Sequence, residues 1–318
     1  MKIRTSTGIE FAQQHGQTLL DASIEAGYPI NHSCRSGRCG FCKVRVISGE
    51  SLRYRREELS ATDIQQDYIL SCARSATTDM LIDAGQLEQV LLPRQVSIPC
   101  AIASLSLIHP DLLKVSLLLP LVARLDYLPG QYVRISNRAG VSGAYALASA
   151  APIERMVDVY IMRSNDAMSD YWFSQATAGE LLTVQGPYGN FYLRDVSQRR
   201  LLLIANRGGM PAIRALLQAH AQLPEAQQAH SLELLWLSTD EDDRCLAQSE
   251  LAGFAAKLSI LPAHATLAEY LQSRISKQIA DTSIYASAPT SVLQQLNDCV
   301  NALGLAEQHV FANDMESG

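Results

Sequence analysis

Four cysteines have the type and spacing to hold a metal cluster. Cys34, Cys39 and Cys42 follow the pattern C-x4-C-x2-C, and Cys72 follows the third of them after 29 intervening residues. Thiolates in this order are typical of plant-type [2Fe–2S] clusters, in which two irons each take two cysteine sulfurs. We therefore predict that these four cysteines are the metal ligands of one [2Fe–2S] cluster.

Two glycines inside the cysteine loop, Gly37 and Gly40, support this interpretation. A loop that offers three ligands must wrap closely around the cluster, and glycine permits the open backbone angles that let N–H groups point at the sulfurs. The alternatives are a zinc site, disulfides and buried free thiols. Zinc sites more often combine two C-x2–4-C pairs, and an odd total of seven cysteines favours a reducing compartment. The spacing therefore favours the cluster.

Composition sets limits on the class of protein. The chain has 318 residues, enough for two or three domains, with 47% hydrophobic and 18% charged residues. A net charge of −6 argues against a nucleic-acid or membrane-surface partner. No apolar run approaches the length of a membrane span, and the N-terminus lacks the apolar core of a signal peptide. We expect a cytoplasmic globular protein.

Other residues with chemical potential form no recognisable site. The seven histidines have no metal or catalytic spacing, and no Ser/His/Asp set can be assembled, so no catalytic residue is predicted. Cys100, Cys245 and Cys299 are scattered and are expected to be small buried hydrophobes. The acidic run Asp240–Asp243 follows an expected strand and is interpreted as an exposed loop.

A basic run, Arg53-Tyr-Arg-Arg56, has two interpretations. Such a run is usually a solvated face. It also lies close in sequence to the cysteine loop, which favours a docking surface for an acidic partner. In that second interpretation the surface would also include Arg35, Arg38, Lys43 and Arg45.

The elements expected around the cysteines indicate a first domain over residues 1–92. Apolar spacing over 18–27, ending in a glycine, predicts a helix. Alternation over 43–47 predicts a strand that leaves the cysteine loop, and 67–70 leads directly into Cys72. Residues 89–99 are interpreted as a linker.

Two further domains are expected. β-rich runs on either side of 109–111 predict a hairpin, and further strands as far as 192 predict a small antiparallel barrel over 96–195. From residue 196 onward, apolar strands at 201–205, 232–237, 257–261 and 283–286 alternate with helix-length segments, including a helix that runs through Ala219. This alternation predicts a doubly wound parallel sheet over 196–318.

The chain resembles the ferredoxin–flavin reductases, in which a plant-type ferredoxin domain of β-grasp fold (α+β) is fused to a flavin barrel and a nucleotide domain. All four cysteines match, and Pro129-Gly-Gln-Tyr132 and Gly186-Pro-Tyr-Gly-Asn-Phe191 are the best marks of the later domains. Oxygenase reductase components and CDP-6-deoxy-glucoseen reductases share this order. The resemblance implies an FAD cofactor, NAD(P)H as substrate and an electron-accepting partner enzyme of the oxygenase or sugar dehydratase type.

The chain departs from the family at the flavin. The family's Arg-x-Tyr-Ser sequence, which neutralises the pyrophosphate, packs on the ring and bonds its edge, corresponds to Gly143-Ala-Tyr145-Ala146. The resemblance thus implies that Tyr145 packs on the flavin, without the cation and the hydroxyl. The family's Gly-x-x-Ser segment corresponds to Asp166-Ala-Met-Ser169. Ser169 is expected as a helix N-cap and flavin contact, whereas Asp166 would repel a phosphate.

The nucleotide marks have changed as well. The family's Gly-Gly-Thr-Gly turn corresponds to Asn206-Arg-Gly-Gly209, its Cys-Gly-Pro to Ser287-Ala-Pro289, and its C-terminal aromatic to Met315. Substitute phosphate partners are available: Arg134, Arg138, Arg163 and a Gly208-Gly209 turn before a helix that contains Pro211.

Two functions remain open at this point. The first is an NAD(P)H-dependent reductase that passes electrons through FAD to the cluster and on to a partner. The second is a non-enzymatic ferredoxin-like relay whose C-terminal domains have lost their cofactors and serve as a partner scaffold.

Overall fold

The computed structural model describes residues 1–153, 155–238, 240–262, 264–275, 279–304 and 309–314, so Met315 lies outside it. The chain divides into two compact units. One comprises Met1–Leu92 with two later segments, Thr266–Ala280 and Pro289 onward. The other comprises Pro93–Ala265 and Asp281–Ala288. The three domain boundaries expected from the sequence stay a prediction.

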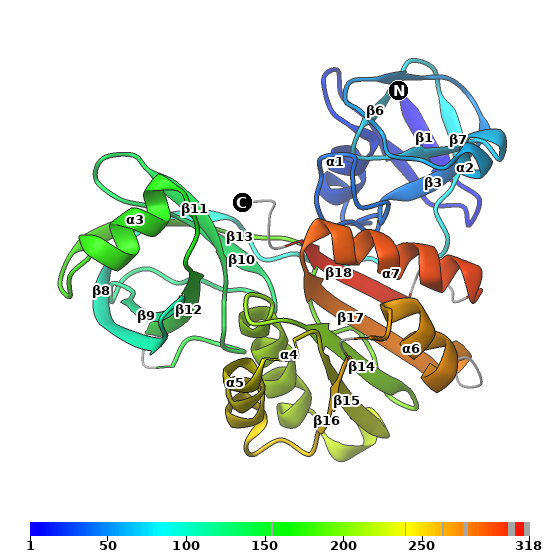
Figure 1. Cartoon of the computed structure of the whole chain (residues 1–318). Coiled ribbons are helices and arrows are strands. Elements are labelled where there is room, and N and C mark those ends of the chain that lie inside the picture. Colours follow the sequence, from blue (N-terminus) through cyan, green and yellow to red (C-terminus); the bar gives the residue numbers. More distant parts are fainter. Residues whose placement is uncertain (154, 239, 263, 276–278, 305–308, 315–318) are drawn as a thin grey trace. The chain divides into compact units, whose positions relative to one another are not determined.

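The first unit is built on a mixed five-stranded sheet in the order β2-β1-β7-β3-β5, beside a two-stranded β4-β6 ribbon. Its strands are β1 (Lys2–Thr5), β2 (Glu10–Ala12), β3 (Lys43–Ser48), β4 (Ser51–Arg53), β5 (Tyr68–Leu70), β6 (Arg74–Ala76) and β7 (Met80–Asp83). Helices α1 (Leu19–Glu25) and α2 (Ala61–Gln65) belong to this part. The later segments add α6 (Leu267–Ile275), η2 (Ile279–Asp281, which begins in this unit), α7 (Thr290–Ala302) and β18 (Val310–Asp314), with α7 beside β18 (Figure 1).

Local sequence explains these elements. Thr18 caps α1 by accepting a hydrogen bond from the Asp21 N–H, so the predicted helix begins where its capping residue stands. Alternation along β1 turns Ile3 and Thr5 inward. Ile3, Leu19 and Leu70 are fully buried in one core with two of the cluster cysteines, Cys42 and Cys72.

The second unit opens with an antiparallel six-stranded sheet in the order β11-β10-β13-β8-β9-β12. Its elements are β8 (Val96–His109), β9 (Leu112–Leu118), β10 (Tyr132–Ser136), β11 (Ser142–Ala146), β12 (Met156–Met162), α3 (Ala167–Ser174) and β13 (Leu181–Tyr188). A bridge between Leu147, just after β11, and Val159 in β12 closes the sheet into the predicted barrel. Alternate residues such as Val133, Ile135 and Val184 fill its interior.

The hairpin predicted around 109–111 is confirmed, since β8 pairs antiparallel with β9. The linker prediction is wrong at its C-terminal end. Strand β8 already begins at Val96, and Pro99 pairs in register with Thr183 of β13. At Pro99 the pairing of β8 with β13 outweighs the weak strand propensity of proline, and pairing with β9 begins only at Ala101.

A parallel sheet makes up the rest of this unit, with β16, β15, β14 and β17 adjacent in that order. The bounds are β14 (Arg200–Ala205), α4 (Met210–Gln222), η1 (Glu225–Gln227), β15 (Ser231–Trp236), α5 (Glu241–Leu251), β16 (Lys257–Ile260) and β17 (Thr282–Ala288). Helix α4 packs beside β14 and β17 (Figure 1). The predicted fold class of a ferredoxin domain, an antiparallel barrel and a parallel α/β sheet is confirmed.

The acidic run at 240–243 is not a loop, which corrects that prediction. Asp240 is the N-cap of α5 and accepts hydrogen bonds from the N–H groups of Asp242 and Asp243. Carboxylates in a first turn favour a helix because they complement its dipole. Within the described residues, no helix is both long and apolar enough to cross a bilayer.

Candidate iron–sulfur centre and cofactor positions

The four predicted ligands lie together in the first unit, and all are buried: Cys34 is 5% exposed, and Cys39, Cys42 and Cys72 are 2% exposed. The pairing of β3 with β5 brings the distant cysteine to the loop. Lys43 pairs with Leu70, and the Ser71 N–H donates to the Cys42 carbonyl at 2.9 Å. Cys72 therefore follows the strand that lies alongside the one leaving the loop.

The loop backbone has the open angles predicted for it. Gly37 and Gly40 have φ of +79° and +81°, and Arg35 is also left-handed at +52°, which the sequence did not indicate. With these turns, the N–H groups of Ser36 and Cys39 both donate to the Cys34 sulfur at 3.4 Å. Donors of this kind stabilise a thiolate and a cluster bound to it.

The thiols associate two and two. The pKa of Cys34 is lowered to about 4, chiefly because the Cys39 thiol donates a hydrogen bond to its sulfur, and the pKa of Cys39 is raised by the same contact. The Cys42 thiol donates in the same way to Cys72, which raises the pKa of Cys42 and lowers that of Cys72. A binuclear cluster distributes its four cysteine ligands two to each iron. Among the described residues, no three His, Cys, Asp or Glu side chains converge as ligands of a single ion.

Two buried hydroxyls next to the ligands also fit a cluster. Ser33 and Ser71 precede Cys34 and Cys72, and within the described chain neither Oγ has a hydrogen-bond partner. A buried hydroxyl without a partner costs free energy, which a sulfur acceptor would offset. The residues present therefore fit a [2Fe–2S] cluster, which would supply one-electron chemistry, with Cys34, Cys39, Cys42 and Cys72 as its ligands.

One side of the loop is contacted by α7 and β18 of the same unit. Gln294 donates to the Arg38 carbonyl at 3.0 Å, and Asn31 donates to the Val310 carbonyl at 2.7 Å. Gly40 lies so close to Asn297 that a Cβ at this glycine would come within 2.7 Å of the amide nitrogen. This side of the loop is thus held by the chain itself.

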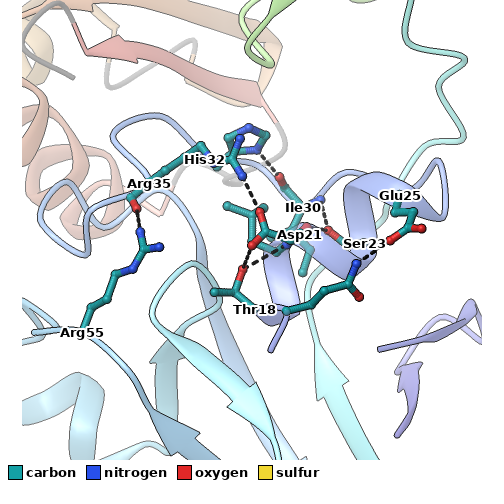
Figure 2. A network of polar contacts seen from close by, with 10 residues as sticks. Thr18, Asp21, Ser23, Glu25, Ile30, His32, Arg35 and Arg55 are labelled. Carbon is teal, nitrogen blue, oxygen red and sulfur yellow. Dashed lines mark hydrogen bonds and ion pairs between the residues drawn. The ribbon is translucent and has the colours of Figure 1, made fainter. Parts of the chain in front are cut away.

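The start of the loop is fixed by a polar network around α1 (Figure 2). Arg35 forms an ion pair with Asp21, whose pKa is lowered by Thr18 and Arg35 against the opposing effect of its own burial. Arg55 donates to the Arg35 carbonyl at 2.7 Å, and the buried His32 ring bonds the Ile30 carbonyl. This network couples the loop to the 53–56 segment.

In the barrel, Tyr145 contacts a neighbouring aromatic residue. Its hydroxyl accepts a hydrogen bond from the Trp172 Nε1–H at 2.9 Å, and the two rings meet edge to face. Its ring also covers Gly143, because a Cβ there would lie 2.3 Å from the Tyr145 hydroxyl. Tyr145 pairs in register with Val133, a core residue, so both side chains point to the same face of the strands. Tyr145 therefore occupies the space that an arginine at 143 would need.

Ser169 is not the N-cap of α3, which corrects that prediction. Asp166 is the cap, and its carboxylate accepts from the Met168 and Ser169 N–H groups at 2.8 and 2.9 Å. The Ser169 hydroxyl is buried and accepts from the Ser164 N–H at 3.0 Å. Aspartate and serine cap helices about equally well, and Asp166 is the cap because it lies immediately before the first helical residue. The helix N-terminus thus already holds an anion.

The turn at 206–209 uses its own donors. The N–H groups of Gly209 and Met210 donate to the Asn206 carbonyl, and Gly209 also donates to the Asn206 side chain. Arg207 forms an ion pair with Asp243, and its Nη1 donates to His109 at 2.7 Å. The N–H groups of Gly209 and Met210 are thus already bonded within the turn.

The residues expected near the nicotinamide are enclosed. Ser287 and Ala288 have no exposed surface. A Cβ at Gly209 would lie 1.9 Å from the Ser287 carbonyl oxygen, so α4 begins directly against the end of β17.

The substitute arginines differ in availability. Arg163 stacks on the Phe173 ring, 3.9 Å from its centroid, and forms an ion pair with Asp111. Arg134 makes a long 3.5 Å contact with the Ser142 hydroxyl, whereas Arg138 is exposed in the turn after β10. Arg134 and Arg138 remain candidates for a phosphate contact.

Two stretches that carry the family resemblance meet in the barrel. The Gln131 side chain accepts from the Leu128 N–H and donates to the Gly189 carbonyl. Tyr132 and Tyr188 pair across β10 and β13, with ring centroids 5.6 Å apart. The two stretches that carry the resemblance therefore contact each other in the barrel, while Tyr145 and the start of α3 have other partners.

Comparison with known proteins supports the presence of an iron–sulfur domain in the first unit. Residues 3–77 match the family model of the 2Fe-2S iron-sulfur cluster binding domain. The curated CDP-6-deoxy-L-threo-D-glycero-4-hexulose-3-dehydrase reductase of Yersinia pestis is 27% identical over 225 residues, which is 70% of this chain and 68% of that protein. The toluate 1,2-dioxygenase electron transfer component of Pseudomonas putida is 26% identical over 315 residues, 93% of this chain and 91% of that protein.

Among solved structures, an Amycolatopsis cytochrome P450 reductase covers 100% of this chain and 99% of its own, with a TM-score of 0.66 and 19% identity. At this identity the likeness shows a shared fold. The polypeptide as a whole thus has the architecture found in that reductase, and its sequence relatives are reductase and electron-transfer components.

Proposed function

We propose, from the homology of this chain to reductase components and from its four buried cysteines, that it is an iron–sulfur electron-transfer oxidoreductase. Electrons would pass from NAD(P)H through FAD to a [2Fe–2S] cluster, and on to a partner enzyme of the oxygenase or sugar dehydratase type. We assign residues 1–92 to the ferredoxin domain, 96–195 to the flavin-type barrel and 196–318 to the nucleotide-type domain. We place the protein in the cytoplasm.

The observation that carries this proposal is the cysteine site. Cys34, Cys39, Cys42 and Cys72 are nearly inaccessible, are paired two and two, and lie beside buried hydroxyls and backbone donors that face sulfur. We assign these four as the cluster ligands. The protein would hold the cluster in place and tune its potential, while the cluster carries the electron.

A second candidate, the electron relay, is favoured by the barrel and the parallel sheet. Tyr145 is bonded to Trp172, and Asp166 occupies the start of α3. Ser287, near which a nicotinamide would lie, is fully buried. Contacts of Tyr145 and Ser169 with FAD stay a proposal.

A rapid-mixing experiment separates the two candidates. Anaerobic protein is mixed with NADH or NADPH, with and without added FAD, and reduction is followed at the cluster absorbance. The reductase predicts fast reduction by a nucleotide. Because hydride transfer depends steeply on the approach of the nicotinamide to the flavin, the relay, which the buried Ser287 and Ala288 favour, predicts slow or absent reduction, whereas dithionite should reduce the cluster readily in both cases. Fast reduction by either nucleotide would establish the full reductase; failure with both, even with FAD, would establish the relay.

A further inference from the structure

We propose that a basic face beside the cysteine loop is the docking surface for an acidic region of the electron-accepting protein. We call the exposed residues Arg35, Leu52, Arg53, Tyr54, Arg55 and Arg56 the basic face. This inference rests on the proposed function, because it requires that an electron leave the protein at the loop.

The basic face is bonded directly to the cluster-binding backbone. Arg55 donates to the Arg35 carbonyl, next to Cys34, at 2.7 Å (Figure 2). The Tyr54 N–H donates to the Ala73 carbonyl, next to Cys72, at 2.9 Å. An acceptor bound at this face would therefore lie next to backbone groups that adjoin two of the cluster ligands, Cys34 and Cys72.

Close packing reinforces the contact. Gly37 lies against the Arg56 backbone, where a Cβ would come within 2.1 Å of the Arg56 carbonyl oxygen. The Glu58 N–H also donates to the Gly37 carbonyl at 2.9 Å. The 53–56 segment and the cysteine loop are thus packed rigidly against each other, so a partner bound to the segment is held in a fixed position relative to the loop.

Exposure on this face is high for the residue types involved. Leu52 and Tyr54 are 52% and 53% exposed, and the Arg56 side chain is 86% exposed. Arginine and tyrosine are enriched where proteins bind one another, because each combines a large contact surface with directional polar groups. An exposed leucine and tyrosine among arginines fit a protein surface better than a small anion.

The charge on this face is positive after its acidic neighbours are counted. Asp21 pairs with Arg35, and Glu58 lies 3.4 Å from Arg56. Arg53 and Arg55 have no carboxylate partner within the described residues. Four arginines and two carboxylates leave two positive charges, in a chain whose net charge is −6.

One neighbouring acid does not cancel this excess. Glu57 is 3% exposed and pairs with Arg74 at 2.7 Å. In register, Arg53 lies directly across the β4-β6 ribbon from Arg74, a like-charge arrangement that costs stability. Binding of an acidic partner would offset that cost.

The other basic residues near the loop do not extend this face. Lys43 is 9% exposed at its side chain and pairs with Asp63 at 2.9 Å, so it is a structural ion pair. The side of the loop at Arg38 and Gly40 is contacted by Gln294 and Asn297 of α7. The basic face is thus the side of the loop that the first unit leaves open to a partner.

The test compares two haem proteins of opposite charge as electron acceptors. The full chain is reduced with dithionite, freed of excess reductant and mixed anaerobically with acidic cytochrome b5 or basic cytochrome c at several salt concentrations. One electron passes from the reduced cluster protein to ferric haem, which becomes ferrous. Because the net charge of −6 would repel an acidic acceptor, a cytochrome b5 rate that falls with added salt reports the local positive face.

The variant is Arg53→Glu/Arg55→Glu, and the control is Arg94→Glu/Arg124→Glu, which makes the same charge change on exposed arginines of the second unit. We expect the variant to lower the cytochrome b5 rate at low salt at least about tenfold relative to the control, with the two converging at high salt. The cytochrome c rate should rise in the variant. Cluster absorbance and iron content must equal those of the wild type.

Two results would overturn the proposal: equal cytochrome b5 rates in variant and control, or a wild-type rate that does not fall with salt. Absence of a reducible cluster in the wild type would instead reject the proposed function. The two failures are therefore distinguishable.

Discussion

At the scale of single residues, the assignment of the cluster ligands depends on four thiols. One of them, Cys72, is brought to the other three by the pairing of β3 with β5. Cys72→Ser should abolish the cluster or leave an unstable remnant, because a serine hydroxyl is a poor replacement for the thiolate that iron requires. Iron and acid-labile sulfide are assayed per chain. Cys299→Ser is the matched control, since Cys299 is a half-buried cysteine of α7 outside the site. Undiminished iron and sulfide in Cys72→Ser would contradict the assignment.

The unpartnered Ser71 hydroxyl gives a second prediction at this scale. If its hydrogen points at a cluster sulfur, it stabilises the more negative, reduced state. Ser71→Ala should therefore shift the reduction potential to a more negative value while iron content stays the same. An optical redox titration measures the shift, with Ser48→Ala, at the exposed end of β3, as the control. A potential equal to that of the wild type would show that the hydroxyl does not face the cluster.

The Tyr145–Trp172 contact makes the flavin prediction specific. Restoring the family's anchors as Gly143→Arg/Ala146→Ser should tighten FAD binding by about tenfold or more, because an arginine–phosphate contact is charge-assisted. The arginine can fit only if the Tyr145 ring moves off position 143, so adding Trp172→Phe should increase the gain. Apoprotein is titrated with FAD by fluorescence. Tight wild-type binding without any gain in the double variant would show that Arg134, Arg138 or other residues have replaced the anchors.

At the scale of elements, the start of α3 is where helix stability and anion binding compete. Asp166→Ala should lower stability by about 1 kcal/mol, because two N–H groups lose their acceptor, whereas Asp166→Asn should keep most of the cap. The pKa of Asp166 is lowered by the Ser164 hydroxyl and by the Ser169 and Met168 N–H groups. The charge therefore contributes stability above the unfolded pKa of about 3.9 and loses it as the pH falls through the lower folded value.

Melting temperatures of the wild type and Asp166→Asn test this sign. The wild type should be the more stable at pH 7, and the difference should shrink below pH about 4. A difference independent of pH would show that the charge of Asp166 plays no part. If a phosphate approaches this helix, Asp166→Asn should also tighten FAD binding, since the repelling charge is gone.

At the scale of the second unit, Arg207 joins three segments that are far apart in sequence. It pairs with Asp243 of α5, lies 3.8 Å from Asp111 and donates to His109, both at the β8-β9 turn. Its side chain is 15% exposed, so Arg207→Met leaves the enclosed Asp243 carboxylate without its cation. We expect a loss of about 2 kcal/mol or more in the free energy of unfolding.

Urea unfolding followed by tryptophan fluorescence measures this loss, because Trp172 lies in the barrel and Trp236 in the parallel sheet. Arg244→Met is the control: its pair with Glu241 is exposed and should contribute no more than about 0.5 kcal/mol. Equal losses in the two variants would show that the Arg207 cluster does not tie the barrel to the sheet.

Local patterns in the sequence determined much of this protein. The cysteine spacing, the left-handed glycines at 37 and 40, the Thr18-capped helix and the alternation of strands and helices after residue 196 each depend on neighbouring residues, whose conformational preferences act over a few positions. Such features predicted the fold class and the candidate cluster ligands. The predicted cap of α3, Ser169, lies three residues after the actual cap, Asp166. The sequence does not distinguish the two, because both residue types are acceptable caps.

Only the tertiary structure decided which hydrogen-bond and ion-pair partners the side chains of the candidate sites have. Tyr145 keeps the family's residue type but is bonded to Trp172, Arg207 is enclosed by acids from two other segments, and Lys43 is buried against Asp63. No local pattern contains these partners, since they lie 20 to 96 residues away and meet only when the core packs. The same packing leaves Arg53 and Arg55 exposed beside two cluster ligands, because the Tyr54 N–H bonds the Ala73 carbonyl while the side chains of Arg53 and Arg55 stay exposed.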